Sequence, residues 1–169
     1  MRTKCLNGES YFILFIDDYT RMTWVSFLKE KSEVFEMFKV FKKSVENGTY
    51  LKFKFLRSYN GGEYTSNEFK EFCQQHGIRR QFSIVGTSQQ NGVAERKNRT
   101  MQEMARTMLN GSKLYDIFWT QAIHIVVHVL NRGQIRADSK KNLYELWKGR
   151  PAIFKHFRGI WEQMLHQKK

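Results

Sequence analysis

The feature that most constrains the fold is an alternation between two kinds of apolar spacing along the chain. Tyr11–Ile16 is an uninterrupted run of aromatic and aliphatic residues that ends at an Asp-Asp pair, as a buried strand does where it meets a turn. Met22–Leu28 predicts a second strand, close enough to pair with the first as a hairpin. After this the spacing becomes helical, with Ser32 as the expected N-cap and Asn47-Gly48 as the expected end of the helix.

The same alternation continues along the chain. We predict strands over 52–56 and 78–83, helices over 66–76, 91–109 and 116–131, and a polar loop over 86–90. Strands and helices that alternate in this order are typical of an α/β domain. The sequence contains no internal repeat and no linker, which favours one domain.

The charge of the chain indicates a partner rich in phosphate. There are 29 Lys and Arg residues against 16 Asp and Glu residues, which gives a formal net charge of +13. A nucleic acid is the simplest partner for such an excess. A solvated basic surface without a specific partner is the alternative.

Several classes of protein and site are disfavoured. Cys5 and Cys73 are too few for a disulfide framework, so we expect a reduced intracellular compartment, nuclear or cytoplasmic. The longest apolar runs fall far short of the ~20 residues that span a bilayer, and the N-terminus lacks the layout of a signal peptide. His124 and His128 lie in an apolar run without the glutamate of a zinc-hydrolase helix, so we expect packed or surface histidines rather than ligands.

Two sequence blocks carry the clearest functional signal. The first reads Arg57-Ser58-Tyr59-Asn60-Gly61-Gly62-Glu63-Tyr64, and the second reads Gln-Gln-Asn-Gly-Val-Ala-Glu-Arg-Lys-Asn-Arg-Thr over 89–100. Between Tyr59 and Glu95 there are 35 residues. With the segment 15–21, Phe118-Trp119 and Asn131-Arg132 in the same order, these blocks resemble the catalytic core of copia-type retrotransposon integrases. In that family an Asp stands where this chain has Tyr59.

The resemblance covers roughly residues 2–158, and it implies a fold and partners. The implied fold is RNase H-like, an α/β fold whose five-stranded mixed sheet has helices on both faces. The implied ligand is DNA, and the implied cofactor is Mg²⁺ or Mn²⁺. The implied protein partner is a second copy of the chain, in a homodimer, or an intact integrase. We therefore assign residues 1–158 to an incomplete integrase-core-like domain and leave 159–169 as an unassigned tail.

The same resemblance implies that one strand of the sheet is missing. In the family, the strand that carries the first catalytic Asp comes just before the position of Met1 and lies centrally in the sheet. We expect the remaining strands to flank a missing centre, with the first ten residues filling part of the gap. Unpaired backbone groups that are buried cost free energy, so we predict marginal stability.

The carboxylates needed for two-metal chemistry are depleted. Strand transfer of this class uses two divalent metals roughly 3.5–4 Å apart, and Mg²⁺ prefers oxygen ligands such as carboxylates. By resemblance the family provides two Asp and one Glu, of which only Glu95 remains as the candidate catalytic and metal-binding residue. A phenol with a pKa near ~10 leaves Tyr59 neutral at working pH. Recruitment of Asp17, Asp18 or Glu63 is the alternative, but these acids are more simply explained as turn and capping residues.

The helix that carries Glu95 predicts a surface for nucleic acid. Glu95, Arg99, Gln102 and Arg106 recur at steps of four, three and four, which places them on one helix face. Arginine can bind phosphate oxygens through two hydrogen bonds, whereas an exposed polar face with a weak Glu95–Arg99 pair is the alternative. The predicted nucleic-acid-binding residues are Gln89, Gln90, Asn91, Arg96, Asn98, Arg99, Gln102 and Arg106.

The leading functional prediction is a remnant of a retrotransposon integrase core that retains nucleic-acid binding and is catalytically inactive. One alternative is an active metal-dependent nuclease that uses recruited carboxylates. A second alternative is a module that binds a protein partner. A third alternative is a decayed reading frame without function. DNA cleavage assays with Mg²⁺ or Mn²⁺ test the nuclease alternative. Co-purification with an intact integrase after nuclease treatment tests the protein-binding alternative.

Overall fold

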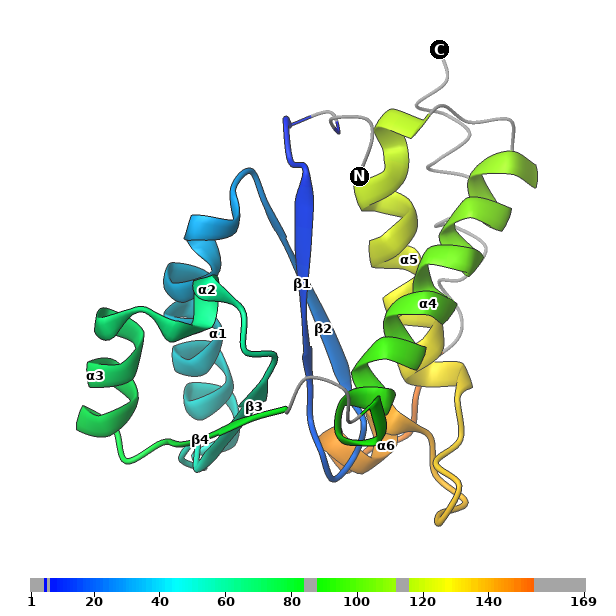
Figure 1. Cartoon of the computed structure of the whole chain (residues 1–169). Coiled ribbons are helices and arrows are strands. Elements are labelled where there is room, and N and C mark those ends of the chain that lie inside the picture. Colours follow the sequence, from blue (N-terminus) through cyan, green and yellow to red (C-terminus); the bar gives the residue numbers. More distant parts are fainter. Residues whose placement is uncertain (1–4, 6, 84–87, 112–115, 154–169) are drawn as a thin grey trace. The chain divides into compact units, whose positions relative to one another are not determined.

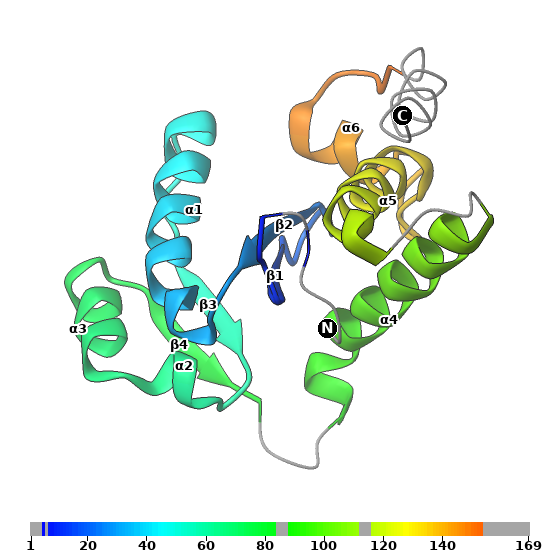
Figure 2. The same ribbon diagram turned by 90° about the horizontal axis from the view of Figure 1, so that it is seen from above.

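The computed structural model describes residue 5 and residues 7–83, 88–111 and 116–153, without the side chains of 88–91 and 116. The chain divides into two compact units, shown in two views in Figures 1 and 2. Unit 1 consists of residues 1–27 and 97–169, and unit 2 consists of residues 28–96. Within the described residues, no helix combines the length and the apolar character that a bilayer span requires.

Unit 1 combines a β-hairpin with helices. The hairpin is formed by β1 (Tyr11–Ile16) and β2 (Thr23–Leu28), and the helices are the later part of α4 (Ser88–Gly111), η2 (Asp116–Phe118), α5 (Trp119–Gly133) and α6 (Leu143–Lys148). Helices α4 and α5 lie side by side in both views (Figures 1 and 2). Their facing residues form an apolar core because they recur at helical spacing: Met101, Ala105, Leu109, Ala122, Ile123, Val126 and Val127.

A buried amide joins the hairpin of unit 1 to α5. The side chain of Asn131 accepts a hydrogen bond from the backbone nitrogen of Thr23 at 3.0 Å and donates to its carbonyl oxygen at 2.7 Å. This amide therefore bonds the first residue of β2 as a neighbouring strand would, and it satisfies two backbone groups that are otherwise buried without a partner.

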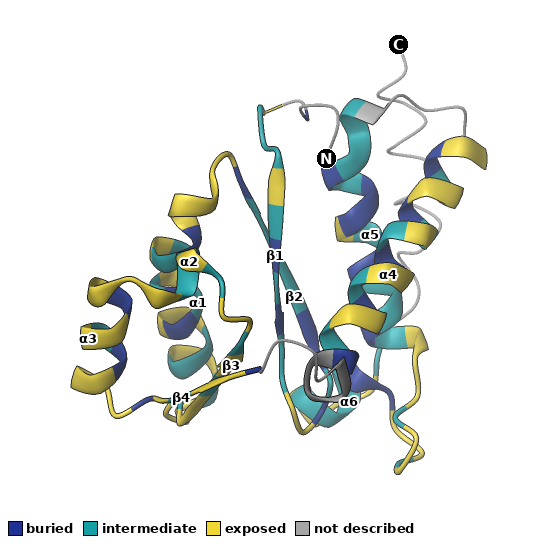
Figure 3. Cartoon of the chain, in the orientation of Figure 1, coloured by how far each residue is buried: buried dark blue, intermediate teal, exposed yellow. Residues whose placement is uncertain are grey.

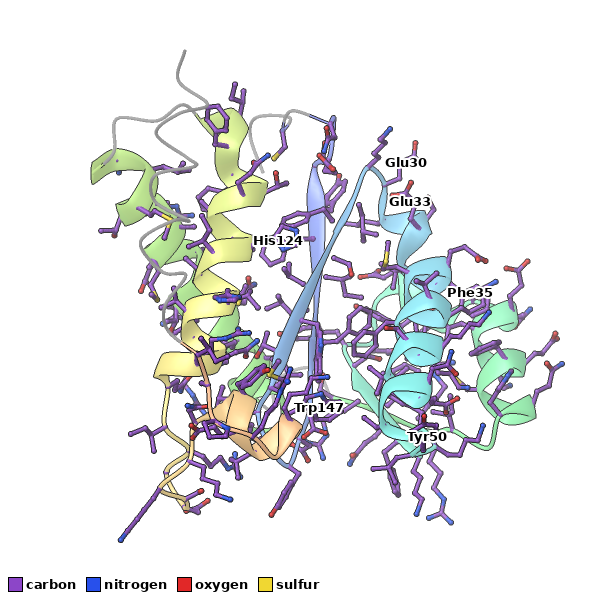
Figure 4. All side chains as sticks on the ribbon, turned by 180° about the vertical axis from the view of Figure 1, so that it is seen from behind. Glu30, Glu33, Phe35, Tyr50, His124 and Trp147 are labelled. Carbon is purple, nitrogen blue, oxygen red and sulfur yellow. The ribbon has the colours of Figure 1, made fainter. Side chains whose placement is uncertain are left out.

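Unit 2 is built around a cluster of phenylalanines. It contains η1 (Lys31–Glu33), α1 (Val34–Thr49), β3 (Phe55–Ser58), α2 (Gly62–Thr65), α3 (Asn67–Gln75), β4 (Arg79–Phe82) and the first turns of α4. The rings of Phe38 and Phe69 stack with centroids 5.1 Å apart, and both side chains are almost fully buried. Phe35 lies 5.1 Å from Phe69, and it projects from α1 in Figure 4. Phe38 is thus a core residue, and the half-buried Phe35 packs against this core.

The described strands pair two by two. β1 pairs with β2, and β3 pairs with β4 in parallel, with Phe55 opposite Arg79 and Ser58 opposite Phe82. The described strands therefore form two small sheets, one in each unit.

Several predicted boundaries of α1 and β3 are wrong. Helix α1 does not begin at Ser32, because η1 precedes it and the Glu33 carboxylate accepts hydrogen bonds from the backbone nitrogens of Lys29 and Glu30 (Figure 4). The helix also continues through Asn47-Gly48 to Thr49, and Tyr50 closes it with a left-handed φ of 58°.

The third strand is Phe55–Ser58 rather than 52–56. The reason is a tertiary contact: the backbone nitrogen of Phe53 donates to the Glu46 carboxylate of α1 at 2.8 Å. The start of the predicted strand is therefore bound to a helix, and pairing with β4 begins two residues later.

Helix α4 begins at Ser88, so residues 88–90 are helical and the predicted loop over 86–90 is wrong there. Glutamine favours helix formation, and nothing in Ser88-Gln89-Gln90 prevents it.

Two short helices, α2 and α6, were not predicted from the sequence. The start of α6 has a clear sequence signal, because Asn142 and Glu145 form a reciprocal capping box.

Candidate functional site

The site begins where β3 ends, at Tyr59. This residue follows the strand directly, and its side chain is 45% exposed. The carboxylate of Glu95, on α4 within the same unit, lies close enough to the phenol to raise its pKa. The structure therefore brings together the two positions that the sequence blocks singled out, although 35 residues separate them.

The environment of Tyr59 keeps its phenol protonated. Partial burial raises the pKa of Tyr59 above its ordinary value of 10.0, and the negative charge and the hydrogen bond of Glu95 raise it further. A neutral phenol does not offer the anionic oxygen that a hard divalent cation prefers.

A second tyrosine, Tyr64, lies beside the first. Its pKa is raised to about 12, mainly by burial and further by the charge of Glu63 and the proximity of Tyr59. The Arg80 side chain donates to the carbonyl oxygen of Tyr64, and its guanidinium carbon lies 4.6 Å from the centre of the Phe82 ring. Sequence analysis placed neither Tyr64 nor Arg80 in the site, although Tyr64 belongs to the first motif block.

The acids proposed for recruitment are engaged in their own turns. Asp17 accepts hydrogen bonds at 2.7 Å from both the backbone nitrogen and the hydroxyl of Thr20. Asp18 forms an ion pair with Arg21. The Glu63 carboxylate folds back over the start of α2, where a Cβ added at Gly61 would lie 2.6 Å from one of its oxygens. These contacts agree with the interpretation of Asp17 and Asp18 as turn residues.

These residues do not fit a pair of divalent cations. Among the described residues, the carboxylate of Glu95 lies next to a phenol that remains protonated, and the nearby Glu63 folds back over the start of α2. Among the residues that the structure describes, no three His, Cys, Asp or Glu side chains are grouped so that they could hold a metal ion. Mg²⁺ keeps several of its waters and is bound through one or two carboxylates together with substrate phosphates, so a pair of such cations still needs more than one carboxylate.

The exposed side of α4 carries the predicted surface for nucleic acid. Gln102 donates to Asn98 at 2.9 Å, and Arg106 donates to Gln102 at 3.4 Å, so these side chains form a ladder at successive helical turns. Arg96 and Arg99 are also exposed, and exposed residues recur along α4 in Figure 3. The predicted residues Gln89, Gln90 and Asn91 lie in the first turn of the helix, but their side chains fall outside the described part of the structure.

Lys97 lies between Arg96 and Arg99 in the sequence, but its side chain points into the protein rather than to solvent. Its side chain is buried, and its ammonium donates to Gln134 at 2.6 Å. Burial lowers the pKa of Lys97, and the positive charge of Arg21 lowers it further. Lys97 is therefore part of the interior of unit 1 and does not add to the basic surface.

The two histidines of α5 have structural contacts. The ring of His124 packs edge-on against Phe27 with centroids 4.9 Å apart, and burial lowers its pKa (Figure 4). A ring nitrogen of His128 lies 3.0 Å from the Arg132 guanidinium. These contacts confirm the prediction of packed or surface histidines.

Comparison with known sequences places the chain among mobile-element proteins. The profile of the integrase core domain matches residues 2–88. The retrovirus-related Pol polyprotein of transposon TNT 1-94 from Nicotiana tabacum is 42% identical over 158 residues, which is 94% of this chain and 12% of that polyprotein. The corresponding polyprotein of transposon RE2 from Arabidopsis thaliana is 37% identical over 127 residues, 75% of this chain and 9% of the polyprotein. The chain thus spans about a tenth of these relatives.

Comparison with solved structures shows the same fold at low sequence identity. A chain of the simian T-cell lymphotropic virus intasome, solved in complex with a PP2A regulatory subunit, matches with a TM-score of 0.68 and 17% identity, covering 89% of this chain and 53% of that one. The HTLV-2 integrase catalytic core, solved with magnesium, matches with a TM-score of 0.59 and 20% identity, covering 78% and 80%. The architecture is therefore the RNase H-like fold of integrase cores, as predicted.

Proposed function

Because the chain belongs to the integrase core domain family, we propose that it is an integrase core that binds nucleic acid without carrying out metal-dependent strand transfer. The observation that carries this proposal is the Tyr59 phenol, which stands beside Glu95 and remains protonated. It fills the position next to the remaining carboxylate with a neutral donor, where the copia pattern has an Asp.

The basic side of α4 supports the nucleic-acid part of the proposal. Arg99 and Arg106 are exposed on the helix, and the amides of Asn98 and Gln102 are aligned with Arg106 by hydrogen bonds. Phosphate contacts from such groups bind DNA without reading its sequence. We expect sequence-independent binding to duplex DNA, with the net charge of +13 adding long-range attraction.

A salt titration of duplex binding tests this part. The affinity of the full chain for a labelled duplex should fall steeply as salt rises, and Arg106→Ala should reduce the slope of log K against log salt by roughly 0.9 per lost phosphate contact. Lys140→Ala is the matched control, because Lys140 is an exposed cation in the loop before α6. Absence of binding at low salt, or equal effects of the two substitutions, contradicts the assignment to α4.

A cleavage assay tests the loss of catalysis. The parent chain, Tyr59→Asp and Glu95→Gln are each incubated with labelled DNA and Mn²⁺. We expect no cleavage by the parent, because a carboxylate and a protonated phenol do not hold two metal ions. Cleavage by the parent that disappears in Glu95→Gln would favour the nuclease alternative instead.

The partners and location belong to the same proposal. We expect DNA as the main ligand and an intracellular location, nuclear or cytoplasmic. Self-association, or association with an intact integrase, is the protein contact we expect, since one of the similar cores was solved in dimeric and trimeric forms.

A further inference from the structure

One face of the β3–β4 sheet is exposed and unusual in its chemistry. Alternate residues of a strand point to the same face, so Phe55 and Arg57 of β3 share a face with Arg79 and Gln81 of β4, which pair with them in register. All four residues are exposed, and Phe55 is 62% exposed. An aromatic ring this open to solvent contributes little to the core of unit 2, which is formed by other phenylalanines.

The four side chains are arranged in two cross-strand pairs. The Arg79 guanidinium carbon lies 5.7 Å from the centre of the Phe55 ring. The Arg57 guanidinium donates two hydrogen bonds of 3.2 Å to the side-chain oxygen of Gln81. The sequences of β3 and β4 contain no acidic residue, so the pairs form a strip of one aromatic ring, two planar cations and an amide.

This combination matches the needs of an unpaired nucleotide. Bases stack on exposed aromatic rings and on the planes of arginine side chains, while the same cations attract the phosphates. Bases of an intact duplex are already stacked on their neighbours and do not reach such a ring. The strip therefore fits single-stranded nucleic acid better than duplex DNA, whose bases are not free to stack on Phe55. It also fits better than an acidic protein surface, whose carboxylates would pair with the arginines without using the exposed ring.

We propose that the strip formed by Phe55, Arg57, Arg79 and Gln81 binds unpaired bases of single-stranded nucleic acid. Phe55 is the stacking platform, Arg79 supports the ring and contacts phosphate, and Arg57 and Gln81 present hydrogen-bonding groups along the strand. Tyr59, which follows β3 directly and is 45% exposed, extends the aromatic sequence toward Glu95. The inference shares nucleic-acid binding with the proposed function but uses different residues and a different form of the ligand.

The test measures binding of the full chain to fluorescein-labelled oligothymidine and to a labelled duplex by fluorescence anisotropy at low salt. Phe55→Leu keeps an apolar side chain of similar size and removes the ring, whereas Phe55→Tyr keeps the ring. We expect Phe55→Leu to weaken oligothymidine binding by about fivefold or more, Phe55→Tyr to bind like the parent, and both to bind duplex like the parent.

The matched control is Tyr19→Ala, which removes another exposed aromatic ring from the turn after β1. Thermal melts of each variant verify that it folds, as expected for substitutions at exposed positions. Unchanged oligothymidine binding in Phe55→Leu, or an equal loss for both ligands or in Tyr19→Ala, overturns the proposal. If the parent binds duplex but not oligothymidine, this inference fails while the proposed function stands. If it binds neither, both fail.

Discussion

Replacing Glu46 by Gln should destabilise unit 2 strongly, because Glu46 neutralises a buried lysine. Its carboxylate lies 2.9 Å from the ammonium of Lys42, and the two side chains are only 12% and 9% exposed. The same carboxylate accepts from the backbone nitrogen of Phe53 at 2.8 Å, which fixes the segment that leads into β3 and Tyr59. Lys52 approaches to 3.8 Å from the solvent side.

The expected magnitude follows from the burial of Lys42. Removing one partner of a buried ion pair leaves an uncompensated charge and costs about 3–5 kcal/mol. Because the Gln carbonyl can still accept a hydrogen bond, we expect Glu46→Gln to lower the free energy of unfolding by about 3 kcal/mol, the low end of this range. Urea unfolding followed by far-UV circular dichroism measures the change.

The double variant Lys42→Met with Glu46→Gln provides the control. Replacing both charges together removes the unpaired ion, so the double variant should be more stable than Glu46→Gln alone, since an apolar replacement of a buried pair is often neutral or stabilising. The reasoning is refuted if Glu46→Gln costs less than about 1 kcal/mol, or if the two substitutions add without coupling.

The same pair predicts a dependence on pH. Burial alone would raise the pKa of Glu46, but the hydrogen bonds from Lys42 and the Phe53 amide, with the positive charges of Lys42 and Lys52, lower it below its ordinary 4.5. An acid whose pKa is lower in the folded state stabilises the fold above its unfolded pKa and loses that contribution as pH falls through the folded value. The parent should therefore lose more stability below pH 4.5 than Glu46→Gln does.

Three further outcomes are expected. Asn131→Ala leaves the backbone nitrogen and carbonyl of Thr23 without their partner and should lower the free energy of unfolding by about 2–3 kcal/mol. Urea unfolding followed by tryptophan fluorescence measures the change, because Trp24 is adjacent to Thr23. An unchanged unfolding midpoint contradicts the prediction. Tyr64→Phe should remove the part of the tyrosinate absorbance that appears near pH 12 in a spectrophotometric titration, and an unaltered curve above pH 11 would count against the burial of this phenol. The isolated chain should melt close to room temperature, because unpaired strand edges leave it marginally stable. Circular dichroism records the melt, and a cooperative transition far above room temperature contradicts this prediction.

Local pattern was sufficient for most elements of this chain. The alternation of strand-like and helical spacing placed β1, β2, α1, α3, β4 and α5 near their observed bounds, because each depends on which residues recur every two or every three to four positions. The depletion of carboxylates at the motif is likewise a property of the sequence, since it requires only that Tyr59 stands where an Asp is expected.

Contacts between distant residues decided the rest. The packing of helices and strands places Glu95 beside the Tyr59 phenol and lets Asn131 bond a residue 108 positions away. It also brings Glu46 to the Phe53 amide, so that β3 starts later than predicted. Propensity and spacing describe neighbours within a few residues, whereas these hydrogen bonds join groups that only the folded backbone brings within reach. The sequence alone therefore determined which chemical groups are present, and the tertiary structure decided which of them meet.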